Sequence, residues 1–133
     1  MGSDSLGDRM NGYEQASRAA LPARLPVIVR LDGKAFHTWT RGLERPFCAP
    51  FIDAMNGAAR VLCSEMQGAA LAYVQSDEIS VLLHNYRRLT SSAWFDNEIQ
   101  KIVSVSASIA AATVTAASLG EALSPATWIA GRR

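Results

Sequence analysis

A chain of 133 residues, of which 49% are hydrophobic and 19% charged, is long enough for one domain with a core and too apolar for a disordered segment. Its formal net charge of +1 excludes a strongly basic surface, so a nucleic acid or anionic membrane would have to be bound at a local site. Cys48 and Cys63 lack CxxC or paired-histidine spacing, which favours free thiols in a reducing compartment.

The sequence predicts neither a secretory signal nor a membrane span. The first ten residues, MGSDSLGDRM, carry Asp4 and Asp8 and lack an apolar run. The most apolar later stretch, residues 103–119, is interrupted by serine and threonine and is shorter than the ~20 apolar residues that cross a bilayer. We therefore expect a soluble, cytoplasmic protein without a membrane partner.

The first half of the chain predicts a helix, a strand and a second helix. Apolar residues on one helical stripe predict a short amphipathic helix over residues 4–18. A β-branched run with proline at its first position predicts a strand over residues 26–32. Residues 37–49 are predicted to form a loop. Apolar residues at helical spacing after Pro50 then predict a helix that ends at Gly68.

The second half predicts a hairpin and a long helix. Two strands, over residues 69–75 and 79–84, flank the polar turn QSDE, and a helix over residues 97–118 follows, with Asp96 as its N-cap and Gly120 just past its end. The order predicts an α+β fold with helices on one face of a sheet. It matches a ferredoxin-like βαββα arrangement that stops before its last strand, because the tail shows no alternating pattern.

Two aspartates mark the places where neighbouring strands should end. Asp32 ends the first predicted strand and Asp77 lies in the hairpin turn, and in a βαββ unit these strands are adjacent, so we expect the carboxylates to approach each other. Two close carboxylates favour a cation such as Mg²⁺. Gly33 lets the backbone approach a metal or phosphate, and Lys34 and His37 follow it. This layout suits metal-assisted phosphoryl or nucleotidyl transfer.

The same residues also fit a simpler explanation. Aspartate at a strand end and an Asp-Glu pair in a turn are ordinary turn chemistry. A single histidine such as His37 is more often structural than catalytic, and a lysine near the start of a helix, such as Lys101, is more often only solvated. The spacing of these residues therefore leaves both explanations open.

Four blocks of sequence add a resemblance. They are LGDRMNGYE, RLDGKAFHTWTRG, YVQSDEISVLL and WFDNEIQKIVSVSASIAA. In this order, from about residue 4 to about residue 115, they resemble the N-terminal half of the tRNA-histidine guanylyltransferase family, which includes the related 3′–5′ nucleotide polymerases. The DG-x-x-FH and SDE blocks, with a helix between them, carry the resemblance together.

The resemblance implies a polymerase-palm-like catalytic domain over residues 1–118 that uses two Mg²⁺ ions, followed by an irregular tail, residues 119–133, outside the family. It implies addition of a nucleotide to the 5′ end of tRNA. A monophosphate end is first activated with ATP, and the 3′-hydroxyl of GTP then attacks it. By analogy with family members, the chain would also form homo-oligomers.

Site residues are also implied by the resemblance. Asp32 and Asp77 would be the metal-binding carboxylates, the Gly33 carbonyl a further metal ligand, and Glu78 the third catalytic acid. In an extended strand Glu78 points away from Asp77, so it would support the site from the side. The implied nucleotide-binding residues are Asp32, Gly33, Lys34, Ala35, Phe36, His37, Arg45, Ser76, Asp77 and Lys101.

The chain departs from the family in three respects. Asn97 and Glu98 stand where eukaryotic members carry two arginines, a pattern closer to the bacterial and archaeal branch, which repairs truncated tRNA 5′ ends. Family members are also considerably longer, and the tail resembles none of them. Three alternatives therefore stay open: a fragment that binds GTP–Mg²⁺ without catalysis, another palm-fold enzyme such as a nucleotide cyclase, and an interaction domain without a site.

Overall fold

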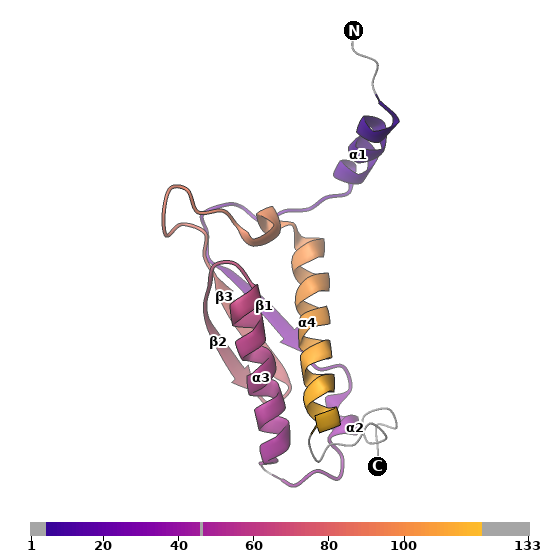
Figure 1. Cartoon of the computed structure of the whole chain (residues 1–133), viewed down its shortest axis with the longest axis vertical. Helices are drawn as coiled ribbons and strands as arrows, with labels where there is room; N and C mark the ends of the chain where they lie inside the picture. Colours follow the sequence, from indigo (N-terminus) through magenta and orange to yellow (C-terminus); the bar gives the residue numbers. More distant parts are fainter. Residues whose placement is uncertain (1–4, 46, 121–133) are drawn as a thin grey trace.

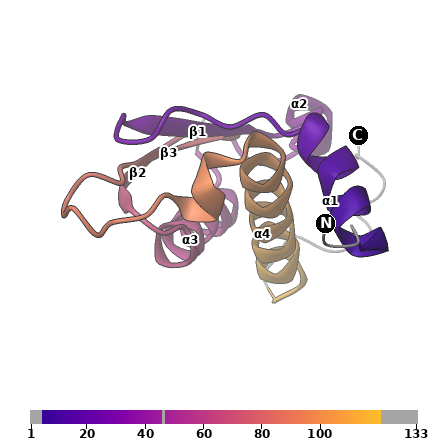
Figure 2. The same cartoon turned by 90° about the horizontal axis from the view of Figure 1, so that it is seen from above.

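The protein, seen here as a computed structural model that describes residues 5–45 and 47–120, has the predicted α+β architecture. An antiparallel sheet of three strands forms one layer, and helices α3 and α4 cover one of its faces (Figures 1 and 2). In chain order the elements are α1 (Leu6–Ala16), β1 (Val27–Asp32), α2 (Phe36–Trp39), α3 (Ala49–Glu65), β2 (Ala69–Gln75), β3 (Glu78–Leu83), the 3₁₀ turn η1 (Trp94–Asn97) and α4 (Ile99–Gly120).

Strand β3 lies at the centre of the sheet, between β1 and β2. Both neighbours run antiparallel to β3, and the β1–β3 register pairs Val27 with Leu83 at one end and Asp32 with Glu78 at the other. The connection through α3 thus passes over β3 to reach β2, which gives the predicted βαββα order. Within the described residues, no strand pairs with the outer edge of β1.

The core fills the space between the sheet and the two long helices. Alternate residues of β3 point inward, so Ile79, Val81 and Leu83 are buried together with Val27 and Val29 of β1. The helices contribute Ala54, Met55, Ala58, Ala59, Leu62, Ile102 and Val114 to this core. The alternation places the polar residues of β1 on the opposite, uncovered face of the sheet.

The segment predicted as a loop over residues 37–49 instead begins inside a short helix, α2. Ala35 precedes this helix in the left-handed conformation, with φ of 56°. The hydroxyl of Thr40 donates a hydrogen bond of 2.7 Å to the Phe36 carbonyl and closes the single turn. A helix of four residues is too short to show the periodicity that identifies longer helices in a sequence.

The start of α4 also differs from the prediction. Asp96 lies in η1 with a left-handed φ of 51° and is not the N-cap. The Glu98 carbonyl instead accepts the first helical hydrogen bond, from the Ile102 amide at 3.0 Å. The helix runs through Gly120, which was predicted to lie past its end. The Trp-Phe segment before Asp96 packs as a separate turn, which delays the helix by two residues.

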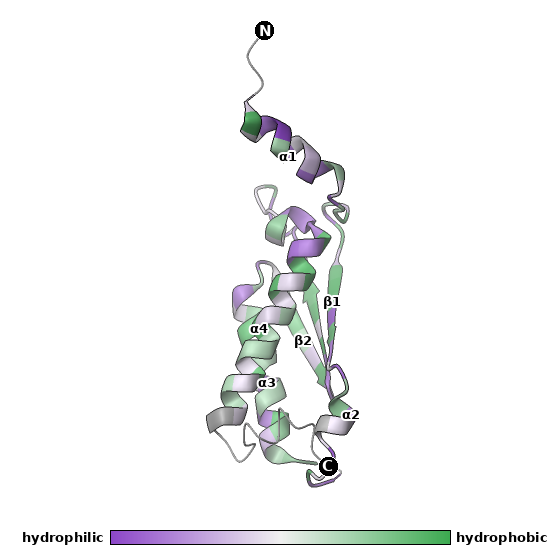
Figure 3. Cartoon of the chain, turned by 90° about the vertical axis from the view of Figure 1, so that its right-hand side faces the viewer, coloured by the Kyte–Doolittle hydropathy of each residue, from purple (hydrophilic) through white to green (hydrophobic). Residues whose placement is uncertain are grey.

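Helix α1 confirms the predicted N-terminal amphipathic helix. It begins with a capping box, in which the Ser5 hydroxyl accepts from the Asp8 amide at 3.1 Å and the Asp8 carboxylate accepts from the Ser5 amide at 3.3 Å. Its apolar residues Leu6, Met10 and Tyr13 are 68%, 54% and 72% exposed. Figures 1 and 3 show the helix standing away from the sheet and from α3 and α4. The apolar stripe of α1 therefore lacks a partner surface within the described part of the chain.

Helix α4 is longer than the apolar stretch identified in the sequence. Its segment Ile99–Ser118 would suffice, by length and composition alone, to cross a membrane, a criterion that a core helix meets as well. In this fold α4 packs on α3 and on the sheet. Even so, only 17% of that segment is buried. Val103, for example, is 58% exposed. Much of α4 is therefore exposed within the described part of the chain.

Candidate nucleotide and metal site

The strand ends that carry the two predicted aspartates meet at one end of the sheet. Asp32 ends β1, and the next amide, that of Gly33, donates a hydrogen bond of 3.0 Å to the Asp77 carbonyl. The predicted adjacency of the first strand and the hairpin is therefore confirmed. Asp32 and Asp77 are both among the residues that line one cavity, and no hydrogen bond or ion pair with another described residue engages either carboxylate.

The turn that carries Asp77 has two residues. Gln75 pairs with Glu78, which leaves only Ser76 and Asp77 to connect β2 with β3. Ser76 has φ of 55°, and positive φ is the feature that lets a two-residue turn match the twist of its strands. The tight turn fixes the Asp77 backbone beside Gly33 while its side chain extends beyond the ladder.

Glu78 lies directly opposite Asp32 in the β1–β3 register. Residues that are directly opposite in an antiparallel pair share one face of the sheet, so Glu78 lies on the same face as Asp32, while its predicted orientation away from Asp77 stays a prediction. The pairing with Asp32 arises because Asp77 belongs to the turn, which makes Glu78 the first residue of β3. Glu78 is nevertheless not among the residues that line the two cavities described below.

Arg30 lies two residues before Asp32 and therefore on the same face of β1. Its Nη2 atom donates a hydrogen bond to Oε1 of Glu78, and the two side chains form an ion pair. This hydrogen bond and the charge of Glu78, with a smaller contribution from Asp32, raise the pKa of Arg30 above its ordinary value. The sequence interpretation missed Arg30, because its contact with Glu78 depends on a strand register that the sequence does not reveal.

Gly33 is the residue type that fits beside Phe36. A Cβ atom at position 33 would lie 2.3 to 2.7 Å from three atoms of the Phe36 ring, closer than real Cβ contacts. The ring cannot easily retreat, because it packs on Phe51 with ring centroids 6.1 Å apart. The Gly33 carbonyl accepts a long hydrogen bond of 3.5 Å from the Phe36 amide, which leaves it a second lone pair. Glycine thus leaves the backbone at the end of β1 free of a side chain, next to both aspartates.

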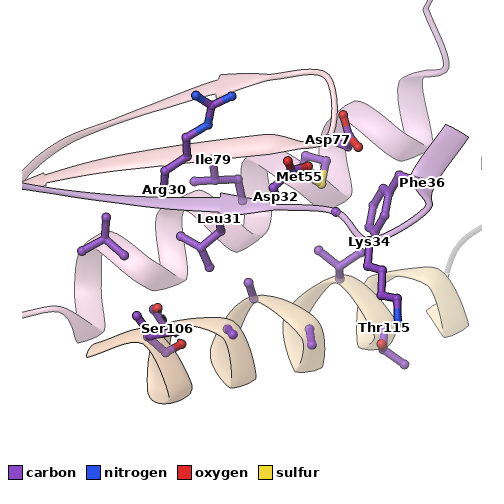
Figure 4. Close-up of a pocket in the computed structure, with 17 residues that line it drawn as sticks. Arg30, Leu31, Asp32, Lys34, Phe36, Met55, Asp77, Ile79, Ser106 and Thr115 are labelled. Carbon is purple, nitrogen blue, oxygen red and sulfur yellow. Dashed lines mark hydrogen bonds between the residues drawn. The ribbon is translucent and has the colours of Figure 1, made fainter. Parts of the chain in front are cut away.

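A cavity of about 380 Å³ lies between β1 and α4 (Figure 4). Its volume falls within the ~300–1,000 Å³ typical of small-molecule sites. Its walls are mostly apolar and are formed by Val29, Leu31, Met55, Ile79, Val103, Ala107, Ala110, Ala111 and Val114. Its polar end holds Asp32, Gly33 and Asp77, and Figure 4 shows Lys34 extending toward Thr115 of α4. The wall contributed by α4 was not predicted from the sequence.

A second cavity, of about 310 Å³, adjoins the first and shares Phe36 and Asp77 with it. His37, Arg45 and Ser76 line this second cavity, together with Thr40, Leu43, Glu44, Cys48 and Phe51. The structure thus brings the predicted nucleotide-binding residues to one place, with two exceptions. Ala35 lies in the same loop but lines neither cavity, and Lys101 lies elsewhere.

Lys101 stands near the start of α4, whereas the acids lie beside its later turns. The cavity reaches Thr115, and the helical rise between the two positions amounts to ~20 Å. The Lys101 ammonium is 3.3 Å from the Glu98 carboxylate, which also lies 3.7 Å from Arg18. Within one chain, therefore, the structure does not bring Lys101 to the acid pair, and its implied contact with a triphosphate stays a prediction.

The donor set at the strand ends fits Mg²⁺. No three histidine, cysteine or acidic side chains gather in a metal-binding arrangement among residues 5–45 and 47–120. The two aspartates and the Gly33 carbonyl offer hard oxygen donors. The space beside them exists because residue 33 has no Cβ atom. Mg²⁺ is commonly held by one or two carboxylates and completes its shell with water and substrate phosphates. Such a site would acquire its full ligand set only when a phosphorylated ligand binds.

Comparison with known proteins identifies the family. The sequence model described as tRNAHis guanylyltransferase (Thg1) matches residues 7–125. The chain belongs to this family. The tRNA(His) guanylyltransferase of Schizosaccharomyces pombe is 41% identical over 70 residues, which cover 51% of this chain and 26% of that protein. The enzyme of the same name from Neurospora crassa is 35% identical over 80 residues, or 59% and 26% of the two chains.

Solved structures of the Thg1 family share this fold. A bacterial tRNA(HIS) guanylyltransferase (Thg1)-like protein in complex with ATP has a TM-score of 0.80 and 50% identity, covering 85% of this chain and 50% of that one. For the complex with GTP, the TM-score is 0.79 at 50% identity, and the coverages are 85% and 54%. The chain thus spans about half the length of these solved relatives, which fits the N-terminal half of the family. The predicted boundary at residue 118 stays a prediction, since residues 121–133 lie outside the described residues.

Proposed function

We propose that this chain is the nucleotide- and metal-binding part of a palm-like nucleotidyltransferase that adds a nucleotide to the 5′ end of tRNA, using GTP and Mg²⁺, with ATP to activate a monophosphate end. The observation that carries the proposal is the convergence of the Asp32–Gly33 strand end, the Asp77 turn and two adjoining cavities. The relatives bound to ATP and GTP supply the chemical class of the ligand.

Each part of the site has a role in this proposal. Asp32, Asp77 and the Gly33 carbonyl would hold Mg²⁺, which when bound neutralises phosphate charge and polarises the phosphoryl group. His37 and Arg45 line the more polar cavity beside Asp77 and would bind phosphate oxygens there. The apolar cavity against α4 would exclude water from the remainder of the nucleotide. The protein's contribution is then mainly positioning and electrostatic stabilisation.

The residues before α4 favour repair of truncated tRNA 5′ ends over recognition of tRNA-histidine. Asn97 is 5% exposed, and its amide donates a hydrogen bond of 3.1 Å to the Pro22 carbonyl. Glu98 is paired with Arg18 and Lys101. The two positions that carry arginines in the eukaryotic branch therefore hold a neutral and an acidic side chain here. Both side chains are engaged in contacts within the fold, and neither supplies a positive charge. We propose the 5′-end repair activity of the bacterial branch on this basis.

A second candidate is GTP–Mg²⁺ binding without transfer. It is favoured by the outer edge of β1, with which no strand pairs among residues 5–45 and 47–120. The net charge of +1 also supplies few cations for the many phosphate contacts that tRNA binding requires. Both candidates place GTP in the same site and differ only in the reaction.

Two measurements on the purified chain test these proposals. Calorimetric titration with GTP should give binding in the presence of Mg²⁺ and none after chelation of the ion by EDTA. Incubation with GTP, ATP and a tRNA that lacks its first nucleotide should then reveal whether the tRNA is extended, and we expect slow, salt-sensitive extension. Binding without extension would favour the second candidate. Absence of Mg²⁺-dependent GTP binding would contradict both.

A further inference from the structure

Arg30 is a cation that the fold places beside Asp32 and Glu78. It lies on the face of the sheet that no helix covers, two residues before Asp32 and diagonally across from Glu78, with which it is ion-paired. The Arg30 side chain is 61% exposed and that of Glu78 is 32% exposed. In the described ranges 5–45 and 47–120, the other ion pairs are those of Arg18 and Lys101 with Glu98, far from this site.

The register makes Glu78 a potential competitor for the metal. The Gly33 amide donates to the Asp77 carbonyl, so the next pair, Asp32 and Glu78, is of the non-hydrogen-bonded type. Side chains of such a pair have Cβ atoms only ~4.5–5.5 Å apart. An unrestrained Glu78 could therefore swing toward a cation held by Asp32. Arg30 pulls its carboxylate the other way, toward the middle of β1.

The number of carboxylates on the ion matters for a phosphorylated ligand. Two carboxylates leave positions on Mg²⁺ for phosphate oxygens and water. A third carboxylate would occupy one of these positions and bring another negative charge next to the triphosphate. Holding Glu78 aside should therefore weaken binding of the bare cation and strengthen binding of the nucleotide.

We propose that Arg30 is a positioning residue that holds Glu78 out of the metal's ligand shell, so that Asp32 and Asp77 bind the cation and leave positions open for the triphosphate. The inference rests on the proposed function and deepens it. It assigns Arg30 a role through Glu78 and requires no contact between Arg30 and the nucleotide.

The test uses the whole chain and Mn²⁺ alone, whose free concentration is read from its electron paramagnetic resonance signal. Arg30→Met keeps the length of the stem but removes the charge, and should lower the Kd for Mn²⁺ about tenfold, because a third carboxylate joins the ion. Arg30→Lys keeps the charge and should restore near-wild-type affinity. Arg18→Met, which removes a cation paired with Glu98, is the matched control and should leave Mn²⁺ binding unchanged.

A double-mutant cycle separates positioning from a simple field effect. Losing one positive charge two residues along a strand, ~7 Å from a divalent ion, alters cation affinity through water about sevenfold without salt, but only about two- to threefold at ~0.15 M ionic strength, where the cycle is measured. In the Glu78→Gln background, Arg30→Met should therefore change the Kd for Mn²⁺ by no more than this amount. Glu78→Gln alone should weaken Mn²⁺ binding by no more than a few-fold, through loss of a nearby negative charge, because Glu78 is not a ligand in the wild type.

The nucleotide gives a second readout that a merely structural role would not produce. At saturating Mg²⁺, Arg30→Met should weaken GTP binding severalfold even though Mn²⁺ alone binds more tightly, and adding Glu78→Gln should restore the GTP affinity. Unchanged Mn²⁺ binding in Arg30→Met, an equal gain in the Glu78→Gln background, or a large loss in Glu78→Gln alone would overturn the inference. A wild-type chain that binds neither Mn²⁺ nor GTP would overturn the proposed function, and this inference with it.

Discussion

Gly33 and Asp77 fasten the end of β1 to the β2–β3 turn through the hydrogen bond of 3.0 Å from the Gly33 amide to the Asp77 carbonyl. Backbone atoms make this bond, so it does not use the aspartate side chains. The carboxylates of Asp32 and Asp77 consequently remain without a hydrogen bond or ion pair to another described residue, at the edge of the cavity that both residues line. Substitutions of these side chains should therefore affect ligand binding much more than folding.

Asp77→Asn and Asp32→Asn should each abolish Mg²⁺-dependent GTP binding, because asparagine removes the charge that attracts the cation. The loss should be at least tenfold in affinity, about 1.4 kcal/mol or more. The melting temperature should stay the same or rise, since removing one of two repelling acids seldom destabilises a fold. Calorimetry and thermal unfolding measure the two effects. Asp53→Asn, on the exposed side of α3, is the matched control and should bind GTP normally.

Gly33→Ala should destabilise the domain by about 1–3 kcal/mol, because the added Cβ would meet the Phe36 ring at 2.3 Å and force it to shift. The free energy of unfolding in urea measures this effect, and GTP affinity should fall as well. Gly57→Ala is the control, since a Cβ atom there meets nothing within 4 Å inside α3. It should stabilise the chain by about 0.5–1 kcal/mol. Equal effects at both positions would show that Phe36 does not constrain Gly33.

Lys101→Ala should leave GTP affinity within about twofold of the wild type in this chain, because the lysine stands ~20 Å along α4 from the acid end of the cavity. Its exposed ion pair with Glu98 should contribute no more than about 1 kcal/mol to stability. Titration with GTP and a melting curve give both values. A clear loss of GTP affinity would support the triphosphate role implied by the family resemblance and would require a site shared between two copies.

The chain should self-associate in solution. The outer edge of β1 is unpaired among the described residues, and Ile28 on this strand is 70% exposed. A free edge strand with apolar side chains promotes strand pairing between two chains. Charged side chains on such a strand oppose this pairing. Light scattering should report oligomers for the wild type and a smaller average mass for Ile28→Lys. A monodisperse monomer at high concentration would contradict this expectation and leave the edge strand without a role in assembly.

Much of the fold could be predicted because its signals are local. The strand over residues 26–32 and the helix after Pro50 follow from apolar periodicity and breakers, and both occur, although the helix ends at Glu65 and not at Gly68. The α2 turn and the start of α4 were missed, since Ala35 and Asp96 adopt left-handed conformations that no periodicity reveals. The two aspartates were placed correctly at the ends of adjacent strands, because βαββ connectivity leaves few alternatives.

The sequence by itself determined the order of elements, the family and the place of Asp32 and Asp77 at strand ends, since these depend on short-range pattern. Only the tertiary structure decided that Glu78 faces Asp32, that Arg30 holds Glu78, and that Lys101 lies at the far end of α4. Strand register explains the difference. A shift of one residue moves every side chain to the other face of the sheet, and the length of the turn and the burial of β3 together set that register.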